Sequence, residues 1–428
     1  MSQPELYVSL DIGSSSVKCI IGEVIDEKTI HMIGVGNEKS SGIRKGSIVD
    51  IDATVQSIKK AVNSAERMMG MSVNKVILGI PATQAMLQDV KGVVAVNSEN
   101  REITDDDLER VMDSAQTMSI APGRELVNLI PRQFTVDNLG EIKDPRGMIG
   151  IRLEMDGTLI TTSQTVLHNV LRCVEKAGLE VQQIYLQPLT SGYFALTNDE
   201  KSRGTLFLDM GAESTTVGVY KDESFTHVSM IPIGGENITK DLSVVLKTSM
   251  EQAEQIKIEY GHAFYDDASE DELFTVPVIG TESKEQYSQR FISEIIGARV
   301  EEIFDVVMDT LYKLNVDDLP GGVVITGGVA KLEGLQQLAS EKLNSRVRLY
   351  IPNQIGARDP ELTSAIGLIR YAYMQSNFYN DFVEDPPIVP PKDEEIINKR
   401  AQSVQKEQKE PKQGMMSRIK GFVERIID

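Results

Sequence analysis

Two segments far apart in the chain carry the same arrangement of an aspartate, a glycine turn and hydroxyl side chains. The first reads LDIGSSSVKCIIG (residues 10–22), and the second, roughly 200 residues later, reads LDMGAESTTVGV (residues 208–219). In each segment an apolar strand ends in Asp, and a tight turn leads into a second apolar strand. The spacing is too long for a solenoid repeat and predicts a duplicated domain.

A hairpin of this composition can hold phosphate and its counter-ion. The turn glycines, Gly13 and Gly211, permit positive φ and leave backbone N–H groups bare to face an anion. The neighbouring hydroxyls add donors, and Asp11 and Asp209 can hold a hydrated Mg²⁺ beside the phosphates. One copy alone is also typical of an ordinary Asx-type hairpin, but two copies in matching context favour a phosphate clamp between two related domains.

A third glycine-rich segment belongs with these two. Residues 321–334, GGVVITGGVAKLEG, form a buried type of strand that breaks into a glycine pair and then a helix start. The backbone at Gly327 and Gly328 can approach a flat base or ribose closely. A strand-to-helix turn that needs glycine for packing explains the same pattern, so both interpretations stay open.

Composition excludes several classes of function. The chain has 428 residues, of which 41% are hydrophobic and 25% charged, as in soluble globular proteins of more than one domain. Its net charge of −20 argues against a nucleic-acid partner, because neutralising phosphates needs clustered Lys and Arg. The first residues are polar and no apolar run approaches the roughly 18 residues of a spanning helix, so we expect neither signal peptide nor transmembrane segment.

Cysteine and histidine usage predicts no disulfide and no metal cluster. Cys19 and Cys173 lie far apart in apolar stretches, so we expect buried thiols of a cytosolic protein. The four histidines are scattered without metal-type spacing, and we expect them to be structural.

The order of elements predicts two α/β layers, each interrupted by an insertion. After the first hairpin we expect a helix at 52–69 and a strand at 73–79, and the same layer resumes with a helix at 168–176. After the second hairpin we expect a helix from Gly235, then a lobe that includes a long amphipathic helix at 288–314.

The first insertion has a pattern of its own. Strands are expected at 90–97, 126–136 and 148–153, with an acid-capped helix that starts after Thr104. These elements suffice for a small α+β subdomain.

The composition changes abruptly at Phe378. Residues 378–414 are rich in Pro, Lys, Glu and Gln, cannot build a core, and predict a disordered tether. The last residues return to helical spacing, with basic residues on the flanks, as in a helix that lies in a membrane surface. Its apolar face is Met415, Met416, Ile419, Phe422, Val423, Ile426 and Ile427. Docking on the protein's own body or on a partner groove is the alternative, and membrane binding by one copy is expected to be weak.

The hairpins, the connecting segment at 184–196 and the glycine-pair strand together resemble the actin/Hsp70/sugar-kinase superfamily of ATP-binding proteins, whose phosphate and adenosine motifs they match in order. Within it, the place of the insertion, the run GIRKGSIVDID (42–52), the segment GGENITKD (234–241) and the tethered tail resemble the FtsA family of bacterial cell-division proteins. The resemblance covers residues 5–373 and the tail. It implies an actin-like two-domain ATPase fold with duplicated ribonuclease-H-like subdomains, an inserted small α+β subdomain, and a disordered tether ending in an amphipathic helix.

The resemblance also implies domain boundaries. We expect the first actin-like subdomain at 1–81, 163–203 and 355–377, the inserted interaction subdomain at 82–162, the second actin-like subdomain at 204–241 and 303–354, an FtsZ-binding lobe at 242–302, the linker at 378–414 and the membrane helix at 415–428.

Carried over residue by residue, the resemblance implies an ATP site with Mg²⁺. Asp11 and Asp209 would flank the Mg²⁺ through water. The β- and γ-phosphates would be held at Gly13, Ser14, Ser15, Gly211, Ser214 and Thr215, and Lys18 is a further cofactor-binding candidate. Gly235 and Asn237 would open the helix over the nucleotide. Glu254 and Lys257 would reach the ribose and base, and Gly327, Gly328 and Lys331 match the adenosine motif. Gln187 would orient the attacking water, which makes Gln187 and Asp209 the candidate catalytic residues. We expect ATP binding and leave turnover open; any hydrolysis should be slow, because the sequence positions no evident base.

By the same resemblance, the protein would polymerise into actin-like filaments. It would be a peripheral protein that tethers the tubulin-like FtsZ to the cytoplasmic face of the cell membrane at the division septum. The C-terminal peptide of FtsZ would dock on the lobe at about 242–312, where Arg299 is the candidate to meet an acidic partner; an Arg299 paired with Glu302 or Asp305 is the alternative. The inserted subdomain would contribute to filament contacts and bind later division proteins.

The second hairpin departs from the glycine-rich pattern that is common in the superfamily. It has Ala212 and Glu213 in the turn. A Glu213 side chain that points outward would be harmless, whereas one that points inward would weaken ATP binding or hydrolysis through like-charge repulsion.

Two other classes fit parts of the sequence. A small-molecule kinase of the same superfamily would need an acceptor pocket with an Asp base near the first lobe, and would have no need of a membrane helix. Other actin-like scaffolds are shape-determining filaments and type IV pilus assembly proteins. The former lack an insertion at this place, and the latter lack the long tether and tail.

Overall fold

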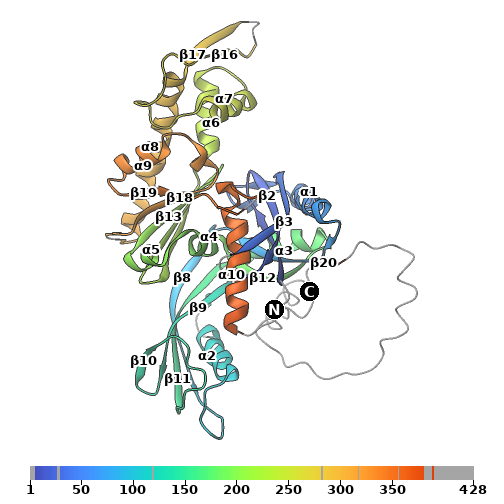
Figure 1. The fold of residues 1–428 in the computed structure, drawn as a ribbon, viewed down its shortest axis with the longest axis vertical. Coiled ribbons are helices and arrows are strands. Elements are labelled where there is room, and N and C mark those ends of the chain that lie inside the picture. The colour runs from blue at the N-terminus through green and yellow to red at the C-terminus, as the bar shows by residue number, and fades with distance from the viewer. Residues whose placement is uncertain are drawn as a thin grey trace, which may run out of the picture.

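The structure of the chain is a computed structural model, which describes residues 5–26, 29–117, 120–280, 283–316, 318–354, 356–379 and 388–389. Figure 1 shows an elongated molecule in which two sheet-based halves flank a central helix, with a helical lobe at one end and an inserted sheet at the other. Most of the predicted tether at 378–414, and all of the tail from Met415 to Asp428, lie outside the described residues.

The first half is built on a five-stranded sheet in the order β12-β7-β1-β2-β3. β1, β2 and β3 form an antiparallel meander, β7 pairs with β1 in parallel, and β12 pairs with β7 in parallel. Because both faces are covered, the inner strands β1, β2 and β7 are mostly apolar and buried. The strands are β1 (Glu5–Ile12), β2 (Ser16–Val24), β3 (Ile30–Lys39), β7 (Lys75–Ile80) and β12 (Glu180–Leu186).

Helices cover both faces of this sheet. On one face α1 (Ile51–Met69) packs on β2 and β3 beside α3 (Gln164–Lys176), and on the other α10 (Thr363–Tyr379) packs on β1 and α4 (Gln187–Ala195). The N-terminus of α1 is capped by the Asp50 side chain, which accepts the Ala53 N–H.

The second half repeats this topology. Its sheet has the order β15-β14-β13-β18-β19, again an antiparallel meander extended by two parallel strands. The duplication predicted from the two hairpins is therefore present in the fold. The strands are β13 (Thr205–Met210), β14 (Thr215–Lys221), β15 (Ser224–Ile231), β18 (Gly322–Thr326) and β19 (Val347–Leu349).

A helical lobe extends from the second half. It contains α6, α7 and the long α8, with a small hairpin of β16 and β17 at its tip (Figure 1). Its core is continuous with that of the second sheet. The elements of the lobe and of the rest of this half are α5 (Asn198–Arg203), α6 (Gly235–Val245), α7 (Met250–Tyr260), β16 (Leu273–Pro277), β17 (Lys284–Ser288), α8 (Gln289–Lys313), the 3₁₀ turn η1 (Gly328–Lys331), α9 (Leu335–Lys342) and the 3₁₀ turn η2 (Pro360–Leu362).

The insertion in the first half forms a separate four-stranded sheet with its own apolar core. One helix packs on this sheet. The prediction of a strand at 148–153 was wrong, because the strand begins at Arg152 and continues to Ser163 in the middle of the sheet, paired on both sides. The elements are β8 (Met86–Ala95), α2 (Asp105–Thr117), β9 (Arg124–Val136), β10 (Leu139–Ile142) and β11 (Arg152–Ser163).

Short strands complete the description. A two-residue hairpin joins β3 to α1, and another short pair lies against the first half. These strands are β4 (Ile43–Arg44), β5 (Ser47–Ile48), β6 (Ser72–Val73) and β20 (Ile388–Val389).

The chain crosses between the two halves twice, through α4–α5 and through the segment from β19 to α10. At the second crossing the buried hydroxyls of Thr326 and Thr363 lie 2.7 Å apart, and Thr326 also donates toward the carbonyl of Tyr350. These bonds tie the end of β18 to the start of α10. The second crossing is thus held by buried polar contacts.

The predicted fold class is confirmed: two related actin-like halves, each with a ribonuclease-H-like sheet, and a small α+β insertion. Cys19 and Cys173 are buried free thiols, as expected. Among the described helices, none is long and apolar enough to cross a membrane.

Candidate functional site

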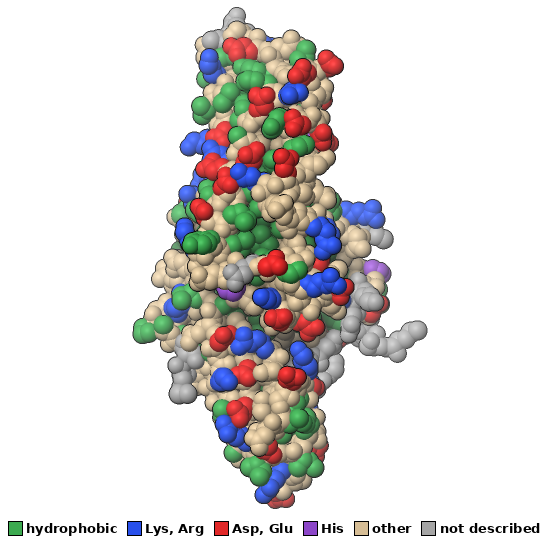
Figure 2. All heavy atoms as spheres, turned by 90° about the vertical axis from the view of Figure 1, so that its left-hand side faces the viewer, with side chains coloured by type: hydrophobic (Ala, Val, Ile, Leu, Met, Phe, Trp, Pro, Cys, Tyr) green, Lys and Arg blue, Asp and Glu red, His purple; other side chains and the backbone are tan. Residues whose placement is uncertain are grey.

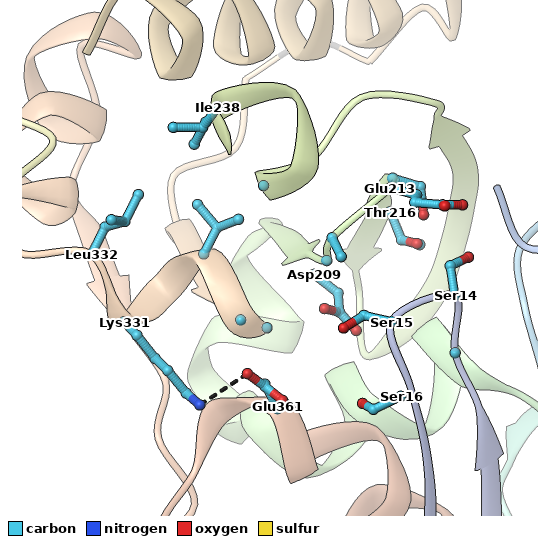
Figure 3. A pocket seen from close by; sticks show the side chains of 18 of the residues that line it. Ser14, Ser15, Ser16, Asp209, Glu213, Thr216, Ile238, Lys331, Leu332 and Glu361 are labelled. Carbon is cyan, nitrogen blue, oxygen red and sulfur yellow. Dashed lines mark hydrogen bonds and ion pairs between the residues drawn. The ribbon is translucent and has the colours of Figure 1, made fainter. Parts of the chain in front are cut away.

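A cavity of about 520 Å³ lies between the two halves, and both hairpins open onto it. Figure 3 shows Ser14 and Ser15 entering from the first half, opposite Asp209, Glu213 and Thr216 of the second. Fifteen of the predicted nucleotide and catalytic residues line this cavity: Asp11, Gly13, Ser14, Ser15, Lys18, Gln187, Asp209, Gly211, Ser214, Gly235, Glu254, Lys257, Gly327, Gly328 and Lys331.

The two hairpin turns have the same backbone geometry. The N–H of Gly13 donates to the carbonyl of Ser16 over 3.1 Å, and the N–H of Gly211 donates to that of Ser214 over 2.9 Å. A Cβ on Gly13 would lie 2.9 Å from the Ser16 oxygen, so the turn needs glycine for a close approach of the backbone. The sequence repeat therefore corresponds to a repeat in structure.

The residues opposite the two aspartates differ between the copies. In the first hairpin Asp11 pairs across the strands with Lys18, and the ammonium lies 3.6 Å from the carboxylate. In the second, Asp209 pairs across the strands with Thr216. Directly opposed residues share one face of a sheet, which explains why Lys18 and Thr216 both reach the cavity.

This difference shows in the electrostatics. Burial raises the pKa of Asp11, and the charge of Lys18 opposes the rise. For Asp209, burial, then the charge of Asp11 and that of Glu361, raise the pKa to about 6, against a smaller lowering by Lys18. The floor of the cavity therefore holds more negative charge than its cation balances.

Gln187 completes the floor. It is the first residue of α4, and its side-chain amide donates to Asp11 over 2.6 Å. A Cβ on Gly79 of β7 would lie 2.9 Å from the Gln187 side chain, so the small residue leaves room for the amide. The contact brings the predicted water-orienting residue to the predicted Mg²⁺ ligand.

Two predicted residues do not reach the cavity. Thr215 is fully buried and its hydroxyl donates to the Ile233 carbonyl over 2.9 Å, so Thr216 takes the position at the cavity instead. The side chain of Asn237 accepts the N–H of Gly234 and caps α6.

The start of α6 is held against the second hairpin. The N–H of Gly235 donates to Gly211 over 2.9 Å, and the N–H of Glu236 donates to Ala212 over 2.7 Å. A Cβ on Gly234 would lie 2.5 Å from the Gly211 oxygen. The glycine pair therefore serves close packing, and the first amides of α6 are already used within the protein.

A polar cluster lines the far side of the cavity. Lys257 donates to Glu254 over 2.7 Å, to the Thr239 hydroxyl over 2.8 Å and to the carbonyl of Gly235 over 3.1 Å. Glu254 also hydrogen-bonds Thr239. Glu254 and Lys257, the two residues of α7 predicted to bind the nucleotide, are thus held in place beside the start of α6.

The glycine-pair strand carries a second cluster. Lys331 lies 2.7 Å from Asp359 and 2.9 Å from Glu361, two acidic residues of the second crossing. Figure 3 shows the pair with Glu361. Glu361 packs over Gly328, where a Cβ would lie 3.3 Å from the carboxylate. Lys331 is therefore engaged within the protein. Glu361 is a cavity residue that was not predicted from the sequence, since no motif marks the 3₁₀ turn η2 in which it lies.

The Glu213 side chain lies at the cavity and is paired with groups of the first half. It is 9% exposed, accepts the Lys45 N–H over 2.5 Å and meets the Arg44 guanidinium at 2.7 Å. Both partners belong to the β4–β5 hairpin of the first half. The sequence indicated the repulsion that this carboxylate could cause, but not the cation that pairs with it.

Arg299, predicted to meet a partner, is bonded within the lobe. It makes a two-point contact with Asp241, at 2.5 and 2.9 Å, and an ion pair with Glu302 one turn on. Asp305 pairs instead with Lys342 at 3.0 Å.

Within the described ranges, no group of three or more His, Cys, Asp and Glu side chains gathers to hold a metal ion. Asp11 and Asp209 are two carboxylates on one cavity, and this donor set fits Mg²⁺, which proteins commonly hold through one or two carboxylates together with waters and substrate phosphates.

Comparisons with known proteins agree with this architecture. Residues 206–367 match the model of the family described as "Cell division protein FtsA", and residues 83–161 match the "SHS2 domain inserted in FTSA". The chain is 51% identical over 372 residues to the cell division protein FtsA of Bacillus subtilis (strain 168), an alignment that covers 87% of this chain and 84% of that protein.

Among solved structures, similarity extends to the fold alone. The PilM-PilN type IV pilus biogenesis complex matches with a TM-score of 0.58 at 17% identity, over 85% of this chain and 97% of that one. The MreB5 protein of Spiroplasma citri bound to ADP matches with a TM-score of 0.54 at 14% identity, over 88% and 99%. On the strength of the sequence matches, this chain belongs to the FtsA family of bacterial cell-division proteins.

Proposed function

We propose that this chain is an ATP-binding, actin-like division protein that polymerises and tethers FtsZ to the cytoplasmic face of the cell membrane at the septum. The observation that carries the proposal is the convergence of two matching Asp–Gly hairpins on one cavity from two related halves. A phosphate chain between them would be bound from both sides.

The hairpins supply the donors that phosphate needs. Ser14, Ser15 and Ser214 line the cavity with hydroxyls, and Lys18 adds a cation next to Asp11. Charge-assisted hydrogen bonds of this kind are among the stronger polar contacts in proteins. The glycine turns let the backbone approach the ligand closely.

Mg²⁺ would complete the site. Asp11 and Asp209 would hold the ion through water, and the ion would neutralise the charge of the phosphates. Burial, and after it the negative charges of Asp11 and Glu361, raise the pKa of Asp209, and a bound cation would offset this by favouring the charged carboxylate.

The nucleoside would lie toward α7 and the glycine pair. Gly327 and Gly328 present bare backbone, and Glu254 and Lys257 present polar atoms on the facing side. Apolar side chains of Ile238 and Leu332 add surfaces against which a flat base can pack (Figure 3).

Hydrolysis would depend on Gln187. Its amide nitrogen is bound to Asp11, which leaves the amide oxygen to accept from an attacking water. An amide cannot act as a general base as a carboxylate can, so the turnover we propose is slow.

The helical lobe would dock the C-terminal peptide of FtsZ. Figure 2 shows hydrophobic side chains lying among acidic and basic ones on one face of this lobe. Arg299 would contribute through its exposed edge, although its bonds to Asp241 and Glu302 mean that a peptide carboxylate must compete with them. The exposed apolar residues of the lobe include Val244, Val245, Met250, Ile258, Leu273, Ile279, Phe291, Met308 and Tyr312.

The proposed contacts of the tail with the membrane and of the inserted sheet with other proteins are based on the sequence and on membership of the family. The tail residues from Met415 to Ile427 would lie in the membrane surface, with many copies in a filament adding up weak attachments. The inserted sheet would take part in filament contacts and bind later division proteins.

A liposome-flotation experiment tests the assembly as a whole. The full chain, an FtsZ C-terminal peptide and ATP are spun through a density gradient with and without liposomes; we expect the peptide to float only when chain and liposomes are both present. Deletion of 415–428 should abolish flotation while the melting temperature stays unchanged. If the truncated chain still carries the peptide up with the liposomes, the tethering proposal fails.

A further inference from the structure

The hairpin of β4 and β5, here called the crossing hairpin (residues 42–48), reaches from the first half to the second. Ile43 pairs with Ile48 and Arg44 with Ser47, so only Lys45 and Gly46 form its turn. Both have positive φ, 46° and 72°, which is the pattern of a type I′ turn. The tip is therefore a stiff, two-residue turn.

The tip contacts both phosphate hairpins. From the second half, Glu213 accepts the Lys45 N–H over 2.5 Å and meets Arg44 at 2.7 Å. From the first half, the Ser14 hydroxyl accepts the Gly46 N–H over 3.2 Å. The crossing hairpin thus bridges the two turns between which a phosphate chain would lie.

The charge at this bridge is unbalanced. Arg44 faces two carboxylates, with Glu236 at 3.8 Å as the second. Burial, and after it the charge of Glu213, raise the pKa of Glu236. Arg44 itself is 68% exposed, so its guanidinium can turn without leaving a buried site.

The Glu213 carboxylate and a bound phosphate would compete for the same hydrogen-bond donors. A carboxylate and a phosphate oxyanion both accept from a guanidinium and from backbone N–H groups in the same geometry. Glu213, Gly46 and Ser14 line the cavity. The Glu213 carboxylate therefore lies beside the hydrogen-bond donors that a terminal phosphate between the hairpins would use.

We propose that Glu213 and Arg44 form a latch that responds to the terminal phosphate of a nucleoside triphosphate. With the phosphate absent, Glu213 holds the crossing hairpin and joins the two halves. A terminal phosphate repels Glu213 and takes Arg44 as its partner, while a diphosphate ends short of the latch and leaves it closed. The inference rests on the proposed nucleotide binding and adds to it a specificity-determining pair.

The latch predicts opposite changes in the affinity for an ATP analogue in two variants. Glu213→Gln keeps the shape and an acceptor oxygen but removes the competing charge, so the affinity for a non-hydrolysable ATP analogue should rise about threefold to fivefold. Arg44→Ala removes the phosphate's partner and should lower that affinity by a similar factor. In both variants the affinity for ADP should stay within about twofold of wild type, because ADP does not reach the latch.

The experiment measures both affinities, with Mg²⁺, for the full chain and each variant by calorimetry. Glu154→Gln and Arg132→Ala alter ion pairs of the inserted sheet and serve as matched controls that should change neither affinity. Arg44→Lys, which keeps a cation, should recover part of the loss and replaces Arg44→Ala if that variant does not fold.

Two results overturn the latch. If the Glu213 and Arg44 variants shift both affinities equally, or shift neither while only the melting temperature changes, the pair is a static contact between halves. If the wild-type chain binds neither nucleotide, the proposed function fails first, and the latch falls with it. A selective rise with Glu213→Gln and a selective fall with Arg44→Ala support it.

Discussion

Gln187 donates its side-chain amide to Asp11 over 2.6 Å, and this bond joins the first crossing between the halves to the first phosphate hairpin. Gln187 begins α4, which packs on α10 of the second crossing. The Gln187–Asp11 bond and the packing of α4 on α10 therefore link the first hairpin to both connections between the halves.

Replacing Gln187 separates turnover from binding. Gln187→Ala should lower any ATP turnover by about a hundredfold, because the attacking water loses its orienting acceptor. The affinity for MgATP should change little, since the phosphates keep their donors. Turnover by phosphate release and affinity by calorimetry check this, with the surface variant Gln337→Ala as control. Equal turnover in both variants would remove Gln187 from the mechanism.

Asp209 should make the free protein less stable as the pH rises. Its pKa in the folded protein is about 6, against about 3.9 in an unfolded chain, so the folded state binds the extra proton between these values. The free energy of unfolding therefore falls as pH rises from about 4 to about 6, and stays lower above that.

The variant Asp209→Asn tests this sign. Asn carries no charge, so without nucleotide the variant should be more stable than wild type at pH 7.5, by up to about 2 kcal/mol given the partial exposure of Asp209 to the cavity. The advantage should shrink at pH 5 and vanish below pH 4. Denaturant unfolding at the three pH values measures it. A gain that is the same at every pH would show that the charge is not its source.

The positive charge of Lys331 should offset the negative charges of Asp359 and Glu361, which would otherwise repel the phosphates of ATP. Lys331→Ala leaves Asp359 and Glu361 without their cation, and Glu361 already acts on Asp209. We expect ATP affinity to fall by about tenfold, the effect of roughly 1.4 kcal/mol of repulsion. Adding Glu361→Gln should restore most of the loss. A double variant as weak as Lys331→Ala would mean that Lys331 contacts the nucleotide directly.

Gly36 is required for the packing of α1 on the first sheet. A Cβ at Gly36 would lie 1.8 Å from the backbone oxygen of Ala61, so Gly36→Ala must push α1 away from β3. We expect a loss of about 2–3 kcal/mol in the free energy of unfolding. Gly140→Ala is the matched control, because the nearest atom to its Cβ is 3.5 Å away. Similar stability of both variants in urea would contradict this close contact between α1 and β3.

The sequence predicted the parts of the fold that repeat or that follow a local period. The second Asp–Gly hairpin implied the duplicated sheet, and the periodicity of residues 52–69 matched α1, whose cap at Asp50 and stop at Gly70 are local signals. Strand β11 was misplaced, because its bounds follow from pairing with β8 and β9, and only the assembled sheet shows that Arg152–Ser163 is one of its two inner strands.

The site was predictable where the motif is local. Strand alternation could have placed Thr216, opposite Asp209, at the cavity in place of Thr215. Nothing in the sequence pairs Glu213 with Arg44, which lies 169 residues away, or brings Glu361 to the glycine pair. Such contacts depend on how the two halves pack against each other, and the local periodicity of the sequence does not predict contacts between distant segments.

The central claim is that the two hairpins form one site for ATP and Mg²⁺, and ligand-induced thermal stabilisation tests it most directly. Each protein is melted with and without MgATP, and its shift is taken against its own free form. The account predicts that wild type and the surface variant Asp318→Asn gain about 2.7 kcal/mol at a hundredfold excess over Kd, while Asp209→Ala gains almost nothing. An equal gain in Asp209→Ala would contradict it, because ATP would then bind without the second hairpin's carboxylate.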